Sequence, residues 1–299
     1  MQSIDRGKRN WIPYLFIAPA VVLILCFMVY PVGNVFYYSF QNYNLSQPYS
    51  NGFVGLGNFI KIFHLDSLFY SSLGVSLKWV IIEVLFQLIF GLVIALLLNQ
   101  KFKGRGFCRA AVLIPWAISG VLTSMMWSMM FNEHFGVFNA LLRQIGLIHT
   151  NIAWTANSKT VLGAICLAEL WRGIPFFAIV ILAGLQSIPT ELYESCAVDG
   201  GGRWGSFCNI TLPYLKETII LSTLLRAVWE FNSVDLIYTM TGGGPANATT
   251  TLSMYIAQKA ISASNFGYGS ALVVISFMLL LGFALTYLQM SKFGQEEQL

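Results

Sequence analysis

The sequence is poor in charged residues and lacks the short motifs that mark common enzyme classes. Charged residues make up 10% of its 299 residues, whereas a soluble domain normally carries about 25%. It contains no G-x-x-x-x-G-K-[ST] phosphate loop, no H-E-x-x-H zinc motif and no G-x-S-x-G nucleophile motif. These absences argue against an ATPase, a metalloprotease or a hydrolase, and we expect no catalytic residue in this chain.

Cysteine and histidine are also sparse, and neither forms a ligand pattern. The five cysteines include no C-x-x-C pair, and most lie in apolar or predicted cytoplasmic stretches, so we interpret them as small apolar side chains. His64, His134 and His149 are scattered over predicted external loops without metal-ligand spacing. We therefore expect no metal site and no cofactor, and the net charge of +4 gives no indication of nucleic acid binding.

Long apolar runs predict an all-α polytopic membrane protein. Hydrophobic residues make up 56% of the chain, and a membrane span needs about 20 largely apolar residues. The first run follows Arg6, Lys8 and Arg9 but is too long for the apolar region of a signal peptide, so we expect a retained helix. Six runs of spanning length occur, at 12–32, 75–98, 109–131, 160–182, 218–240 and 266–290.

Lysine and arginine placement predicts the orientation of these spans. With the N-terminus inside, ten of the 17 basic residues lie in inner segments, five in outer segments and two within spans. Because cytoplasmic loops carry an excess of basic residues, both termini, 1–11 and 291–299, are expected in the cytoplasm. The connection 33–74 is then an external cap loop, and 186–215 lies in the cytoplasm.

The connection 186–215 has the features of a helix–turn–helix elbow. Pro189 suits a helix start, and acidic residues follow in the first turns, where they favour the positive end of the helix dipole. Glycines at 200–202 then end the helix and let the chain reverse. A second short helix is expected at 203–209, ended by Pro213.

The same segment resembles the EAA signature of binding-protein-dependent ABC importer permeases, E-A-A-x3-G-x9-I-x-L-P. Glu194 and Gly200 occupy the signature positions, while Ser195 and Cys196 replace the two alanines. In that family the elbow is a coupling helix that docks on a separate ATPase, within a type I ABC importer permease fold. The resemblance implies ATPase-coupling roles for Glu191, Glu194, Ser195, Cys196, Asp199, Gly200, Arg203, Ile210, Leu212 and Pro213.

A T-x-G-G-P stretch, Thr241–Pro245, follows the fifth predicted span. It resembles the first of the two permeases in the carbohydrate branch of this family. The resemblance implies a sugar or oligosaccharide substrate, a second permease as heterodimer partner, two copies of an ABC ATPase holding ATP and Mg, and an external solute-binding protein. It also implies a bacterial inner-membrane location and no enzymatic activity in this chain. A glycerol-phosphate-like or other non-sugar solute, and a secondary transporter, remain as alternatives.

Charged residues also occur within or at the edges of the predicted spans. Each costs about 2.5–3.5 kcal/mol unless it is paired or faces water. Glu169 and Arg172 are three residues apart, and Arg226 and Glu230 are four apart, so two intrahelical ion pairs are one interpretation. The other is a polar cavity that passes a hydroxyl-rich solute. The residues concerned are Glu83, Glu169, Arg172, Arg226, Glu230 and Asp235.

The resemblance extends to the maltose importer branch, from which sugar-contacting positions carry over. Aromatic rings and hydrogen-bonding groups near Pro115 and Pro175 fit a sugar pathway, and proline and glycine are expected to interrupt both helices there. Two arginines leave room for an acidic or phosphorylated glycan. Trp11, Trp79 and Tyr287 are expected to be interfacial anchors. The implied substrate-pathway residues are Trp116, Gly120, Arg172, Gly173, Phe176, Arg226, Trp229, Glu230 and Ser233.

Overall fold

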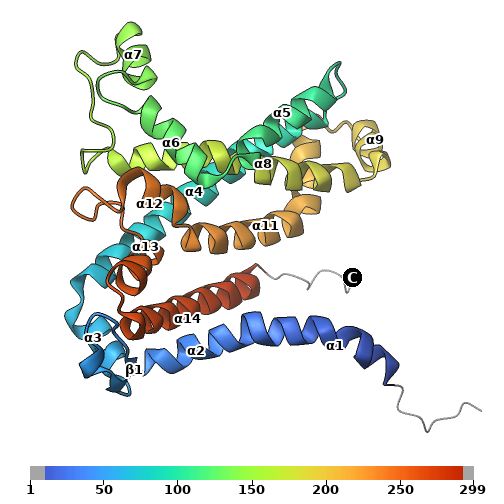
Figure 1. The fold of residues 1–299 in the computed structure, drawn as a ribbon. Coiled ribbons are helices and arrows are strands. Elements are labelled where there is room, and N and C mark those ends of the chain that lie inside the picture. The colour runs from blue at the N-terminus through green and yellow to red at the C-terminus, as the bar shows by residue number, and fades with distance from the viewer. Residues whose placement is uncertain (1–10, 292–299) are drawn as a thin grey trace, which may run out of the picture. The chain divides into compact units, whose positions relative to one another are not determined.

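The computed structural model describes residues 11–291, so all but one residue of each predicted cytoplasmic terminus lies outside the described residues. Helices dominate this part of the chain (Figure 1). It divides into two compact units, one formed by residues 11–65 with 256–277, the other by 66–255 with 278–291. Each unit is described by itself.

The first unit is a long apolar helix followed by a small ordered cap. Asn58 fastens the cap, because its Nδ2 donates to the carbonyls of Ser39 (3.0 Å) and Gln41 (2.8 Å). The Tyr38 and Tyr43 rings stack with centroids 4.8 Å apart. Its elements are α1 Ile12–Ile24, a π segment Leu25–Val29, α2 Tyr30–Ser39, β1 Gln41–Asn42, a 3-10 turn Pro48–Ser50, β2 Gly52–Phe53, α3 Gly57–Leu65, a π segment Gln258–Ser262 and the first half of α14 Phe266–Met290.

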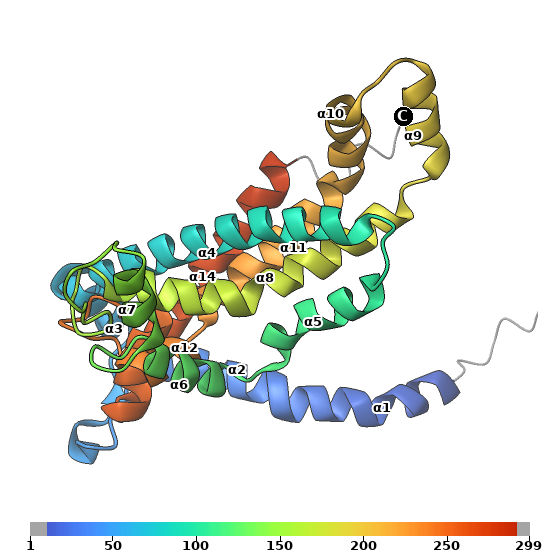
Figure 2. The same ribbon diagram turned by 90° about the horizontal axis from the view of Figure 1, so that it is seen from above.

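The second unit is a helix bundle in which α4, α8 and α11 lie side by side (Figures 1 and 2). Close packing of α4 on α8 depends on Gly91, because a Cβ there would overlap the side chain of Phe177. Its elements are α4 Ser67–Asn99, α5 Arg105–Ala117, α6 Gly120–Met130, α7 Val137–Gln144, α8 Val161–Ser187, α9 Thr190–Val198, α10 Arg203–Ser206, a π segment Phe207–Thr211, α11 Leu212–Asn232, α12 Asp235–Thr241, α13 Leu252–Ala257 and the second half of α14.

Four helices among the described residues are long and apolar enough to cross a membrane, at Pro13–Ser39, Ser67–Asn99, Val161–Ser187 and Phe266–Met290. A fifth span results if α5 and α6, which meet at 91°, are counted as one broken span. The predicted bounds of the first two spans need correction, because α2 runs on to Ser39 and α4 begins at Ser67. The expected loop 33–74 is therefore shorter at both ends. The predicted run 218–240 is also divided, since α11 ends at Asn232 and α12 begins at Asp235.

Proline has different effects at different places in this chain. The helix is interrupted after Pro115, as expected, with Ser119 capping α6 by accepting from the amide of Leu122 (3.4 Å). The expected interruption near Pro175 was wrong, because α8 runs unbroken from Val161 to Ser187 with Pro175 buried inside it. Packing on neighbouring helices holds α8 together despite the missing N–H donor.

Two π segments each end two residues before a proline. Leu25–Val29 precedes Pro31, and Phe207–Thr211 precedes Pro213. In each, the amide just before the proline donates to the carbonyl five residues back, Tyr30 to Leu25 and Leu212 to Phe207. The prediction that Pro213 ends the second elbow helix was therefore wrong, because the chain continues through the π segment into α11.

Candidate functional site: a charged network and a two-helix elbow

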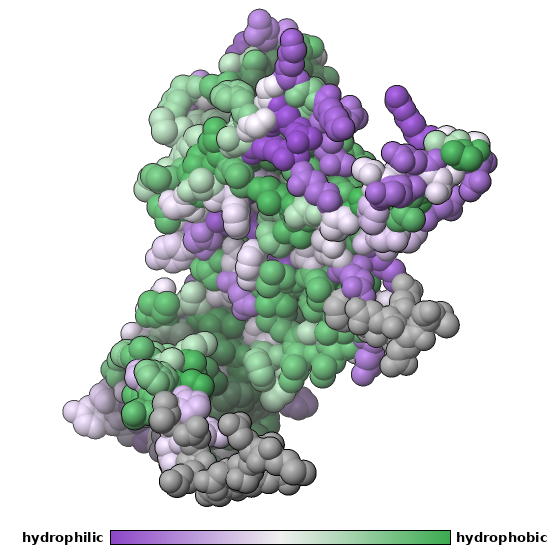
Figure 3. Space-filling view, turned by 90° about the vertical axis from the view of Figure 1, so that its right-hand side faces the viewer, coloured by the Kyte–Doolittle hydropathy of each residue, from purple (hydrophilic) through white to green (hydrophobic). Residues whose placement is uncertain are grey.

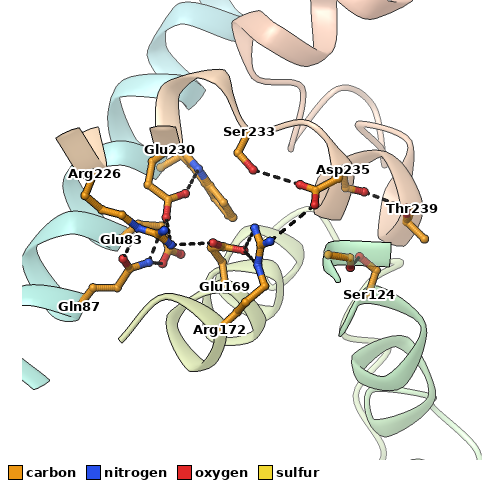
Figure 4. A network of polar contacts seen from close by, with 12 residues as sticks. Glu83, Gln87, Ser124, Glu169, Arg172, Arg226, Glu230, Ser233, Asp235 and Thr239 are labelled. Atoms are coloured by element: carbon orange, nitrogen blue, oxygen red, sulfur yellow. Dashed lines mark hydrogen bonds and ion pairs between the residues drawn. The ribbon is translucent and has the colours of Figure 1, made fainter. Parts of the chain in front are cut away.

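Arg226 lies at the centre of a buried polar network formed by α4, α8 and α11 (Figure 4). Its Nη2 is 2.9 Å from Oε1 of Glu169 and 2.6 Å from Oε1 of Glu230. Its Nε donates to Oε1 of Gln87 at 2.7 Å. One guanidinium therefore joins all three helices, and its charge offsets the desolvation of two carboxylates.

Gln87 and Trp79 on α4 supply further donors to the same carboxylates. Gln87 Nε2 donates to Oε2 of Glu83 (2.9 Å) and Oε1 of Glu230 (3.1 Å). Trp79 Nε1 donates to Oε2 of Glu230 at 3.2 Å, and its side chain is fully buried. The expectation that Trp79 anchors the chain at the membrane interface was wrong, since a buried carboxylate takes up its N–H group.

The network reaches the surface at Arg172, Ser233 and Asp235, which we call the open edge. Arg172 Nη2 lies 2.8 Å from Oε2 of Glu169, and its Nη1 lies 3.6 Å from Oδ2 of Asp235. Ser233 Oγ donates to Oδ1 of Asp235 at 3.3 Å. The Arg172 and Asp235 side chains are 21% and 43% exposed, so this edge offers both donors and acceptors to a solute.

Both predicted intrahelical pairs, Glu169 with Arg172 and Arg226 with Glu230, are confirmed. The bonds between helices were not foreseen from sequence. Trp79, Glu83 and Gln87 carried a signal that was missed, since a spacing of four places all three on one face of α4.

Two glycines among the predicted pathway residues lie directly against the network. A Cβ on Gly120 would overlap the carboxylate of Asp235, and one on Gly173 would overlap Gln87 and the guanidinium of Arg226. These glycines thus leave room for the charged side chains to come together.

Aromatic rings flank the network. The Phe176 and Trp229 rings lie 5.3 Å apart, and the Arg226 guanidinium carbon is 5.9 Å from the Phe176 ring centre. Trp229 is exposed, and Trp116 is exposed on α5 just before the break. The predicted pathway residues on α8 and α11 are thus brought together, while Trp116 lies on a different helix.

The segment after α8 forms two helices joined by a glycine turn. Gly200 has φ of +80°, a conformation that side chains disfavour, and the amide of Gly201 donates to the carbonyl of Cys196 at 2.7 Å. Across the two arms, Tyr193 Oη and Thr211 Oγ1 are 3.0 Å apart. This bond joins α9 to the π segment that leads into α11.

The elbow, residues 189–211, has one face on the bundle and one free face. Leu192, Tyr193 and Ile210 pack against a buried apolar cluster to which α4, α8 and α11 all contribute. On the other face Glu191 and Glu194 are exposed, as are Val198 (87%) and Trp204 (76%). Figure 2 shows α9 and α10 projecting beyond the ends of α4 and α8, and in Figure 3 hydrophilic and hydrophobic residues are interspersed on that side.

A bundle of helices long and apolar enough to cross a membrane, with an ionic network buried between them, defines an integral membrane protein. Residues 87–290 match the family described as binding-protein-dependent transport system inner membrane component, and the chain belongs to this family. It is 36% identical to the trehalose/maltose transport system permease protein MalF of Thermococcus litoralis, over 95% of this chain and 94% of the relative. It is 37% identical to the sulfoquinovosyl glycerol transport system permease protein SmoG of Agrobacterium fabrum, over 96% and 92%. The expected resemblance to sugar ABC permeases is thus confirmed.

The fold matches solved ABC importers. A crystal structure of a bacterial ABC transporter involved in the import of the acidic polysaccharide alginate superimposes with a TM-score of 0.80 at 24% identity, over 95% of this chain and 96% of that one. At this identity the match establishes the fold, the type I ABC permease arrangement.

Proposed function

We propose that this chain is a transmembrane permease subunit of an ABC importer that takes up a sugar or oligosaccharide. The observation that carries the proposal is the exposed elbow, because its sequence has the EAA spacing and its free face is available to a partner. The MalF and SmoG relatives are both named as permeases for sugar-containing solutes, which supports the substrate class.

In the proposed topology α11 also spans the membrane, as the fifth of six spans in chain order. Its 21 residues extend about 31 Å, close to the thickness of the hydrocarbon core. Arg226 and Glu230 within it are paired, which lowers the penalty that two separate charges would carry in a bilayer. With both termini in the cytoplasm, the elbow between α8 and α11 also lies in the cytoplasm, in agreement with the basic-residue distribution.

The proposed mechanism is alternating access. An external binding protein delivers the sugar to a heterodimer of this chain and a second permease. ATP with Mg closes two copies of a separate ATPase, and the elbow passes this movement to the spans. The Tyr193–Thr211 bond and the apolar contacts of Leu192 and Ile210 support the elbow as a rigid lever on α11.

Within the bundle, the open edge and the exposed Trp229 are proposed to contact the sugar. Hydroxyl groups both donate and accept hydrogen bonds, which matches an edge that presents a guanidinium next to a carboxylate. The indole of Trp229 offers an apolar face for the C–H side of a sugar ring.

Co-purification from the native membrane tests the coupling role. We expect a tagged chain to bring down a second permease and a P-loop ATPase. Gly200→Pro is expected to lose the ATPase, because proline cannot adopt φ of +80° and lacks the amide that bonds the carbonyl of Ala197 (3.2 Å). Gly146→Pro is the matched control, since Gly146 has φ of +74° and its amide bonds the carbonyl of Arg143 (3.0 Å), but it lies outside the elbow. ATPase recovery with both variants would contradict the proposal.

A further inference from the structure

The two arginines of the network are already neutralised by carboxylates. Arg226 pairs with Glu169 and Glu230, and Arg172 pairs with Glu169 and Asp235. The sequence alone left room for arginines that bind an acidic or phosphorylated glycan. In the structure, neither guanidinium is left with an uncompensated positive charge for such a group.

Carboxylates outnumber guanidinium groups in this cluster. Glu83 joins through Gln87, so four carboxylates stand against two guanidinium groups, a formal charge of −2. Burial favours the neutral form of a carboxylic acid, but even with the fully buried Glu83 and Glu169 protonated the cluster would carry no net positive charge. Asp235, which is partly exposed, is then the negative charge nearest a solute at the open edge.

The exposed part of the cluster is suited to hydroxyl groups. Arg172 and Asp235 are 3.6 Å apart, and Ser233 lies beside them, so donors and acceptors alternate at the surface without a net excess of positive charge. A neutral saccharide can satisfy both kinds of group. A carboxylate, sulfonate or phosphate would approach the carboxylate of Asp235 and would meet no uncompensated guanidinium.

We infer that this site accepts uncharged saccharides and rejects acidic ones. The inference rests on the proposed function and names the substrate class of the same site. It separates this chain from the alginate transporter, whose fold it shares, and from the SmoG relative, which is named for a sulfonated solute.

Ligand binding to the purified complex of this chain, its partner permease and the ATPase tests the inference. The binding protein is left out, so that its own selectivity does not enter. The probes are trehalose and maltose as neutral sugars, and sulfoquinovosyl glycerol and an alginate disaccharide as acidic ones, each titrated and followed by saturation-transfer NMR. We expect the acidic probes to bind at least about tenfold more weakly, because both guanidinium groups are already paired and the carboxylate of Asp235 repels an anion.

Asp235→Asn removes one carboxylate at the exposed end and leaves Arg172 with a single partner. It is expected to narrow the affinity gap between acidic and neutral probes by about threefold or more, because the negative charge nearest the bound solute is lost. Glu217→Gln, an exposed carboxylate on α11 outside the network, is the matched control and is expected to leave the gap unchanged.

Acidic probes that bind as tightly as neutral ones, or a gap that Asp235→Asn does not narrow, would overturn the inference. The inference would also be overturned if the importer took up sugar while the purified complex bound none of the four probes, since the sugar would then be recognised outside this site. Failure of the intact importer, with its binding protein and ATP, to take up any saccharide would instead refute the proposed function.

Discussion

Replacing Arg226 by methionine keeps most of the side-chain length but removes the charge at the centre of the network. Glu169 and Glu230 then lose their contacts at 2.9 Å and 2.6 Å, and Gln87 loses a donor at 2.7 Å. Removing one partner of a buried ion pair typically costs about 3–5 kcal/mol, because the other charge stays buried without compensation. We expect Arg226→Met to lower the free energy of unfolding by that amount.

Arg172→Met is the matched control for this prediction. Arg172 is partly exposed, and Glu169 would keep its pair with Arg226, so we expect a loss of about 1 kcal/mol. Adding Glu169→Gln and Glu230→Gln to Arg226→Met removes the uncompensated charges and is expected to recover at least about 2 kcal/mol.

The assay is reversible unfolding of the purified chain in lipid bicelles, with the unsubstituted chain and the three variants compared at one pH. A loss below about 1 kcal/mol for Arg226→Met, or no recovery in the triple variant, would refute the view that charge compensation by Arg226 stabilises the bundle.

Three further predictions concern packing and coupling. Gly91→Ala is expected to destabilise the bundle by about 1–3 kcal/mol, because the new methyl group overlaps Phe177, and thermal unfolding of the complex measures it; an unchanged midpoint would contradict the close approach of α4 and α8. Tyr193→Phe removes the hydrogen bond to Thr211, which is worth about 1 kcal/mol. We expect it to raise the number of ATP molecules hydrolysed per sugar molecule imported. An unchanged ratio would show that this bond does not stiffen the elbow. Gly200→Ala places a side chain at φ of +80°, which costs about 1–2 kcal/mol. We therefore expect the chain to bind purified ATPase more weakly in a titration. Equal affinity would contradict a role for this turn.

Apolar runs predicted helices correctly where they were uninterrupted. They failed where the backbone conformation of a few residues ended or continued a helix. The run 266–290 matches α14 in both bounds. At 218–240 the extended residue Ser233, with ψ of 128°, divides the run, and no composition signal marks it. At Pro213 a π segment leads directly into α11, although proline usually ends a helix.

The candidate site was predictable to the extent that its contacts are local in sequence. Pairs three and four residues apart, such as Glu169 with Arg172, follow from helix geometry alone. The bond from Trp79 to Glu230 spans 151 residues and depends on how α4 packs against α11. The pairing of charges in the core therefore depends on tertiary packing. It changes the expectation for the two arginines, which favoured an acidic glycan when considered from sequence and disfavour one when paired with carboxylates.

Uptake by proteoliposomes tests whether this chain works in an ATP-driven sugar importer. The full complex is reconstituted with ATP inside and the binding protein outside, and labelled trehalose and maltose are the probes. We expect uptake that requires both ATP and the binding protein and is abolished by Gly200→Pro but retained by Gly146→Pro. Uptake driven by an ion gradient in the absence of ATP would contradict it and would identify a secondary transporter instead.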